Sequence, residues 1–110
     1  MKIDKTLMSG STALLVLSLL KDGEMYGYEI ISELSRRSDK TFELKEGTLY
    51  PLLHSLERDG AVESFEKASP QGRSRRYYRL TKKGRGLLEE KQREWSLFSQ
   101  KVDQVVYGFA

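Results

Sequence analysis

The 110-residue chain contains no cysteine, a single histidine, a single tryptophan and only two prolines. Without cysteine it can form no disulfide, no thiol nucleophile and no thiolate metal site, which fits a reducing cytoplasm. Its histidine, His54, has only Glu57 and Asp59 as nearby carboxylates, which is too small a set for a metal site. No nucleophile, base and acid can be placed together, so the sequence predicts neither an enzyme nor a bound cofactor.

Long hydrophobic runs are also missing. The apolar stretch at 13–20 is too short to span a membrane. Lys2 and Lys5 precede it as they would in a signal peptide, but the charged segment at 21–24 that follows offers no small-residue cleavage site. We therefore expect one domain, located in the cytoplasm and without membrane contact.

Carboxylates are absent from one segment, residues 67–86. That segment carries eight of the 19 Lys and Arg side chains, whereas the rest of the chain carries the other 11 and all 16 carboxylates, a net charge of −5. One cationic segment on an acidic body is the electrostatic footprint of a DNA-binding element. The alternative for such a charge run is a solvated surface hairpin.

Hydrophobic periodicity predicts three helices in the first part of the chain. The first, at about 5–21, is apolar on too many sides for a surface helix, so it should be buried between neighbours. The second is expected at about 26–38. The third, at 46–60, has leucines at i, i+3, i+4 and i+7, which should face the core. Because Pro51 is tolerated only in a first turn, we expect its regular part to begin near Thr48 as N-cap.

Two short extended runs, 61–66 and 75–80, flank a Ser-Pro-Gln-Gly turn and predict a β-hairpin. Thr81 then caps a long helix that reaches about residue 106. Apolar residues spaced seven and three apart on that helix form a heptad seam, interrupted by Lys91. The seam consists of Leu88, Trp95, Phe98, Val102, Val105 and Phe109. A long helix with no partner in its own chain predicts a homodimer.

The element order predicts a fold that is mostly α with a small β-hairpin. Residues 1–80 are expected to form a winged helix-turn-helix DNA-binding domain, and residues 81–110 a C-terminal dimerisation helix. In this fold the third helix reads base edges in the major groove, and the hairpin, or wing, reaches phosphates and the minor groove.

The candidate DNA contacts lie on the third helix, in the wing, and at the starts of the second and last helices. Hydroxyl, imidazole and cationic groups bond phosphates or base edges. The candidates are Tyr26, Lys45, Thr48, Tyr50, Pro51, His54, Arg73, Arg75, Arg76 and Lys82. Tyr50 has the alternative of packing on the second helix. Of Tyr77 and Tyr78, which alternate along a strand, we expect one in the core and one facing outward.

Trp95, the only tryptophan, has two interpretations. It packs the dimer seam, or it forms the wall of an effector pocket between subunits. In the second case, indoles from two symmetry-related helices would sandwich a planar aromatic small molecule.

Four segments, LMSGSTALLVLSLL, MYGYEI, GTLYPLLHSLERDGAV and GRSRRYYRLTKKGR, occur in an order and spacing that resemble the PadR family of bacterial transcriptional regulators. The resemblance covers roughly residues 7–95. It implies a winged-helix dimer that usually represses its promoter and is released by a small molecule or a stress signal. The C-terminal end resembles the short class with one last helix. Some members of that class sense planar, often cationic, drugs through a tryptophan that Trp95 matches, but no acid stands between Trp95 and Asp103 here.

The sequence therefore predicts a sequence-specific transcriptional regulator, acting as a repressor, whose partners are a double-stranded DNA operator, a second copy of the chain and a planar aromatic effector. Two alternatives remain: a winged-helix module for protein contacts, and a ligand-binding protein without DNA function. Salt-dependent binding to duplex DNA distinguishes the prediction from both alternatives.

Overall fold

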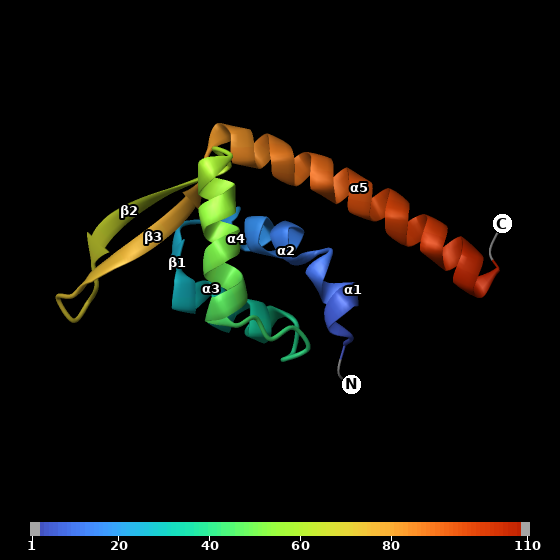
Figure 1. Ribbon diagram of the computed structural model, residues 1–110, viewed down its shortest axis with the longest axis horizontal. Helices are drawn as coiled ribbons and strands as arrows, with labels where there is room; N and C mark the ends of the chain where they lie inside the picture. Colours follow the sequence, from blue (N-terminus) through green and yellow to red (C-terminus); the bar gives the residue numbers. More distant parts are fainter. Residues whose placement is uncertain (1–2, 109–110) are drawn as a thin grey trace.

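Eight helices and strands follow one another along residues 3–108, the part of the chain that this computed structural model describes (Figure 1). They are α1 (Lys5–Ser9), α2 (Thr12–Leu20), β1 (Met25–Tyr26), α3 (Gly27–Arg37), α4 (Glu46–Arg58), β2 (Val62–Ala68), β3 (Ser74–Leu80) and α5 (Lys82–Tyr107). Helices α2, α3 and α4 with the β2–β3 hairpin make a winged helix-turn-helix, and α5 is the long added helix. The predicted fold class is confirmed.

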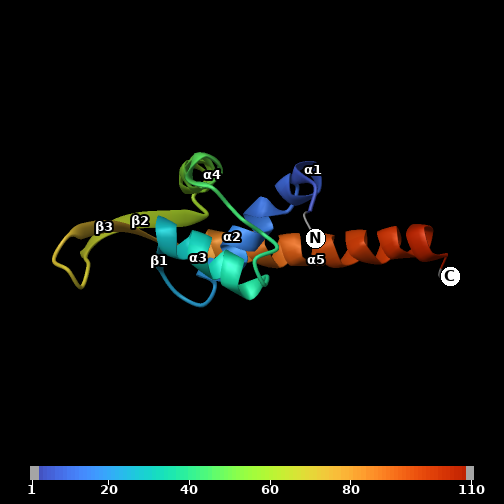
Figure 2. The same cartoon turned by 90° about the horizontal axis from the view of Figure 1, so that it is seen from below.

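The molecule is elongated, with extents of 56 × 32 × 21 Å. The hairpin of β2 and β3 projects at one end, and the second half of α5 projects at the other (Figures 1 and 2). At a rise of about 1.5 Å per residue, α5 alone is about 39 Å long, which accounts for much of this shape. The two projections leave the core between them.

The first predicted helix, 5–21, is in fact two helices with a bend at Gly10 and Ser11. The backbone N–H of Ser11, its hydroxyl and the Thr12 hydroxyl all donate to the carbonyl of Met8, at 2.9, 3.0 and 3.1 Å. These hydroxyl groups thus compete for the Met8 carbonyl, which in a continuous helix would accept a backbone N–H. The prediction of burial holds for α2, which is covered by its own chain.

The second predicted helix, at about 26–38, is confirmed as α3, but the sequence did not indicate that Met25 and Tyr26 form a strand before it. They pair antiparallel with Tyr78 and Tyr77, so the hairpin belongs to a three-stranded sheet of order β1-β3-β2. Tyr26 is extended, at φ −89° and ψ 166°, and its N–H donates to the Glu29 carboxylate at 3.3 Å. Two residues are too short a strand to leave a periodic signal in the sequence.

The start of α4 also differs from the prediction, since the helix begins at Glu46 with Lys45 as its N-cap. Pro51 is therefore the sixth helical residue, beyond the first turn, and the missing N–H leaves the Gly47 carbonyl without its helical donor. Both Gly47 and Pro51 are exposed, so solvent can reach that carbonyl. The helix ends as predicted, because Gly60 adopts the left-handed φ of +80° that a C′ glycine supplies.

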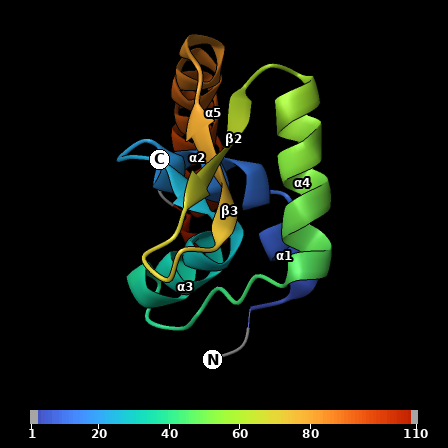
Figure 3. The same ribbon diagram turned by 90° about the vertical axis from the view of Figure 1, so that its left-hand side faces the viewer.

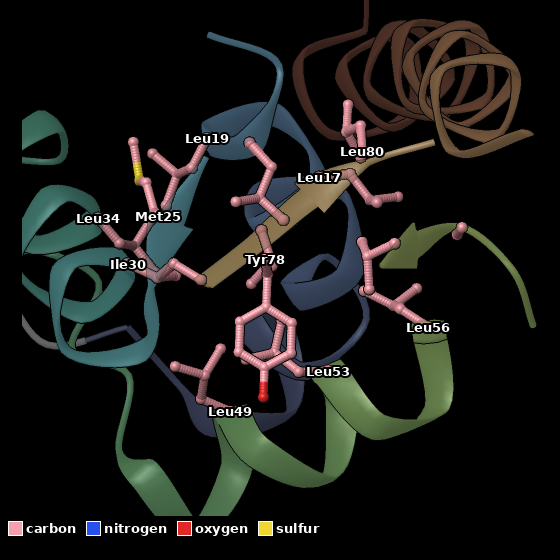
Figure 4. Close-up of a cluster of buried hydrophobic side chains, with 14 of the residues drawn as sticks. Leu17, Leu19, Met25, Ile30, Leu34, Leu49, Leu53, Leu56, Tyr78 and Leu80 are labelled. Carbon is pink, nitrogen blue, oxygen red and sulfur yellow. The ribbon is translucent and has the colours of Figure 1, made fainter. Parts of the chain in front are cut away.

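The core centres on Tyr78, whose ring extends from β3 toward α4 between Leu49 and Leu53 (Figure 4). Burial raises the pKa of the Tyr78 hydroxyl. Around it pack residues from α2, α3, α4 and the strands, including Leu17, Leu19, Met25, Ile30, Leu34, Leu56 and Leu80. Leu88, predicted for the dimer seam, is also in this core with only 3% of its surface exposed. The prediction that the last helix has no partner in its own chain is therefore wrong for its first turns.

The joint between α5 and the hairpin is closely packed. The Thr81 hydroxyl caps α5 by accepting from the N–H of Gly84 at 3.0 Å, as predicted, and it donates to the Gly60 carbonyl at 2.6 Å. The N–H of Thr81 donates to the Ala61 carbonyl at 3.1 Å. A Cβ at Gly84 would collide with that same carbonyl oxygen. The start of α5 is thus fixed against the C-terminal end of α4 and the base of the wing.

Candidate nucleic-acid interface

Helix α4 forms one side of the molecule (Figure 3). Its leucines Leu49, Leu53 and Leu56 are buried in the core (Figure 4). Its opposite side exposes Thr48, Pro51 and His54, and the N-cap residue Lys45 is exposed just before it. This is the side on which a recognition helix carries its base and phosphate contacts. Four of the predicted residues therefore share one accessible face.

A hollow of about 340 Å³ lies where the start of α3, the middle of α4 and β3 meet. Five of the predicted site residues line it: Tyr26, Tyr50, His54, Arg75 and Arg76. The remaining lining residues are Gly27, Tyr28 and Tyr78. Within the described part of the chain this lining contains two guanidinium groups, an imidazole and four tyrosines but no carboxylate. Such a surface is suited to a phosphate-bearing strand.

The hollow depends on a close approach between two helices. A Cβ at Gly27 would collide with the Tyr50 hydroxyl and ring, so only glycine allows Tyr50 to lie across the first turn of α3. The interpretation of Tyr50 as packing on the second helix is therefore the one observed, and its side chain is half-buried. Tyr50 still lines the hollow.

On one face of β3, Arg76 points toward the α4 side of the sheet. Its guanidinium donates to the Ser64 hydroxyl at 2.8 Å and lies 3.6 Å from the Glu66 carboxylate. The Ser64 hydroxyl in turn donates to Glu57 at the end of α4. The carboxylate of Glu66, which no sequence motif indicates, therefore offsets part of the Arg76 charge.

The other face of the sheet carries three cations stacked on aromatic rings. Tyr77 lies in the middle of this face, 5.5 Å from the Tyr26 ring and 6.0 Å from the Phe65 ring. The stacked pairs are Arg75 on Tyr26 at 4.3 Å, Lys67 on Tyr77 at 4.8 Å, and Arg79 on Phe65 at 4.7 Å, measured to the ring centroids. As predicted, Tyr78 lies in the core and Tyr77 on the opposite face of the sheet. The rings and cations around Tyr77 leave it only 8% exposed, so its outward face is covered by side chains.

Besides Lys45, two predicted cations lie outside the lining of the hollow. Arg73 is exposed in the turn at the wing tip, and Lys82 is exposed at the first position of α5, beyond the other end of β3. Across residues 3–108, no group of three or more His, Asp and Glu side chains is placed to hold a metal ion. None of the helices in that range has both the length and the apolar character that crossing a bilayer requires.

The opposite end of the molecule carries apolar groups. Beyond Lys91 the helix α5 exposes large hydrophobic side chains: Trp95, Leu97, Phe98, Val102, Val105 and Val106. A groove of about 410 Å³ lies between α1 and α5, bordered by Leu7, Leu14, Lys91, Trp95 and Phe98 among others. Phe109, the last predicted seam residue, lies outside the described residues.

Comparison with known proteins places these features in a family context. Residues 16–90 match the Transcriptional regulator PadR-like family. A transcriptional regulator of Mycobacterium tuberculosis is 39% identical over 87 residues, covering 79% of this chain and 78% of that protein. A transcriptional regulator from Clostridium thermocellum has a similar structure, with a TM-score of 0.84 and 31% identity over 93% of this chain and 96% of that one. A PadR-like transcriptional regulator from Bacillus cereus has a TM-score of 0.81 and 30% identity, covering 93% and 97%.

Proposed function

Because the chain belongs to the PadR-like family of transcriptional regulators, and is thus a DNA-binding transcription regulator, we propose that it acts as a homodimeric repressor on a pseudo-palindromic operator. It works where the chromosome is, in the cytoplasm. Residues 1–80 form the DNA-binding domain, to which Lys82 adds a contact, and residues 81–110 hold the dimer contacts.

The observation that carries this proposal is the hollow between α3, α4 and β3, which brings two arginines and a histidine together without a carboxylate among its lining residues. In the proposed complex the exposed side of α4 enters the major groove, where Thr48 and His54 bond base edges or phosphates. The wing follows the adjacent backbone, with Arg73 at its tip and Arg75 and Arg76 nearer the hollow. Lys45 and Lys82 add phosphate contacts on either side.

The exposed apolar side chains on the second half of α5 support the homodimer. Phe98 is 56% exposed and Val105 is 85% exposed, although neither carries a polar group that would favour contact with water. Pairing two such helices across a two-fold axis removes both faces from water. A dimer of this kind sets its two α4 helices about 34 Å apart, to meet successive major grooves of one operator.

Trp95 supports an effector role in addition to dimer packing. Trp95 is 47% exposed, its ring lies 6.0 Å from the Phe98 ring, and it borders the groove against α1. A planar aromatic molecule would insert its rings there, while Lys91 supplies a polar edge. A ligand that favours one placement of α5 over another would shift the spacing of the recognition helices and so release the operator. Tryptophan fluorescence titrated with planar aromatics, with and without operator, tests this role.

The experiment that tests the proposed function is selection of bound fragments from sheared genomic DNA, followed by affinity measurements on the enriched duplex. We expect tight binding to that duplex, weaker binding to a scrambled duplex, and an affinity that falls steeply as salt rises. Equal and salt-insensitive affinity for both duplexes would favour a protein-interaction module or a ligand-binding protein instead.

A further inference from the structure

We propose that Tyr26 is a positioning residue for the wing: its ring holds the Arg75 guanidinium at the edge of the hollow, and it acts on DNA through that group. The sequence alone predicts a direct phosphate contact for Tyr26. The structure instead places the Arg75 guanidinium over its ring, 4.3 Å from the centroid. This inference rests on the proposed DNA-binding function, because Arg75 matters only if the wing meets DNA.

Comparison of the three cation–ring pairs shows why Arg75 differs from the other two cations. Lys67 lies 3.0 Å from the Glu24 carboxylate, and Arg79 lies 2.6 Å from the Glu63 carboxylate. In the described residues no carboxylate lies within ion-pair distance of Arg75, whose guanidinium donates only to the Gln71 side-chain oxygen, at 3.3 Å. Arg75 is therefore the stacked cation whose charge remains available to an anion.

The Tyr26 ring is a fixed support for this cation. Its backbone pairs with Tyr77 in the sheet, its N–H donates to Glu29, and its ring meets the Tyr77 ring edge-on at 5.5 Å. These contacts tie the ring both to the wing and to the first turn of α3. An arginine held on such a ring loses less side-chain freedom when it binds a phosphate than one free in solution.

The placement of the pair at the hollow gives it a role in binding. Tyr26 and Arg75 both line the hollow, as does Arg76, although Arg75 and Arg76 point to opposite faces of β3. Without the ring, the Arg75 side chain would be free to leave the hollow. The hollow would then keep only the guanidinium of Arg76, which is paired with the Glu66 carboxylate.

A double-mutant cycle on the full chain tests the proposal by duplex affinity at several salt concentrations. Arg75→Ala should reduce the slope of log affinity against log salt by about one unit per chain. Tyr26→Leu should reduce the salt slope by the same amount as Arg75→Ala. It should also weaken binding about three- to tenfold, because leucine offers the guanidinium no π face. The double variant should bind no more weakly than Arg75→Ala alone. Tyr26→Phe, which keeps the ring and removes the hydroxyl, should bind like the wild type.

The matched control is Phe65→Leu, which removes the ring under Arg79, a cation already paired with Glu63. It should leave the salt slope unchanged even if it lowers the melting temperature. The proposal is overturned if Tyr26→Phe binds as weakly as Tyr26→Leu, which would mark a direct hydroxyl contact, or if the two affinity decreases add in the double variant. If Arg75→Ala itself leaves affinity and slope unaltered while other wing variants reduce them, the positioning role of Tyr26 is wrong but the proposed DNA-binding function stands. If the wild type shows no salt-dependent binding, the proposed function fails.

Discussion

The two projecting ends of this molecule expose opposite kinds of surface. At the wing end, cations are stacked on rings and several are paired with carboxylates, so the exposed groups are polar and held in place. At the α5 end, the exposed groups are large and apolar. Water solvates the first surface well and the second poorly. The first surface is therefore suited to a charged partner, and the second to a copy of itself.

The comparison also shows where rigidity is needed. A surface that recognises phosphates depends on the direction of a few charges, so the wing is braced by Tyr26, Tyr77 and Phe65. An apolar seam depends mainly on the area that it removes from water, which tolerates small shifts of the helix. The closely packed joint at Thr81 and Gly84 connects these two regions.

The largest expected effect comes from breaking the apolar end. The double variant Phe98→Asp, Val102→Asp places four charges in the two-fold seam and should give a folded monomer, because neither side chain is in the core. Loss of the second half-site should weaken operator binding by about 10²- to 10⁴-fold. Sedimentation equilibrium and duplex titration measure both changes. The control Gln100→Asp adds charge at an exposed polar position of the same helix. If the double variant remains a dimer, the α5 seam is not the dimer contact.

A change at the joint between the ends should have the next largest effect. Gly84→Ala forces a Cβ against the Ala61 carbonyl oxygen and should destabilise the fold by about 1–3 kcal/mol. Gly86→Ala, two residues along the same helix, meets nothing within 4 Å and should stabilise the fold by about 1 kcal/mol. Urea denaturation of the two variants compares them directly. Equal stabilities would mean that the joint is not closely packed.

The smallest expected effect sharpens the account of the polar end. Glu66→Gln removes the carboxylate 3.6 Å from Arg76 and should raise duplex affinity about two- to fivefold, since a phosphate no longer competes with an ion pair of modest strength. The control Glu63→Gln frees Arg79 on the other face of the sheet, outside the lining of the hollow. The gain in affinity from Glu66→Gln should become smaller at high salt. A decrease in affinity for Glu66→Gln would mean that Glu66 holds Arg76 in its binding position.

Much of the fold was predictable because its signals are local. The leucine stripe of α4, the Thr81 cap and Gly60 at the end of α4 each depend on residues within one or two helical turns. The two-residue strand β1 was not predictable, because it exists only through pairing with β3 about fifty positions later. Leu88 and Trp95 share a heptad position, yet only the tertiary fold buries the first and exposes the second.

The candidate site was predicted in composition more than in arrangement. Five of the predicted DNA-binding residues meet in one hollow. The order of the elements and the basic hairpin were enough to indicate these residues. The sequence could not show that Arg75 stacks on Tyr26 or that Glu66 pairs with Arg76. Both partners are set by strand register, and a shift of one residue would move each side chain to the other face of the sheet.

A salt titration combined with a mass measurement shows whether the wing end acts on DNA and the α5 end on a second copy of the chain. The triple variant Arg73→Ala, Arg75→Ala, Arg76→Ala and the double variant Phe98→Asp, Val102→Asp are compared with the wild type by duplex affinity and by molecular mass. We predict that the wing variant stays a dimer while its salt slope falls by about one unit for each arginine that no longer neutralises a phosphate. The α5 variant should be a monomer with about half the wild-type slope. An unaltered slope in the wing variant, or a dimer in the α5 variant, would contradict the account.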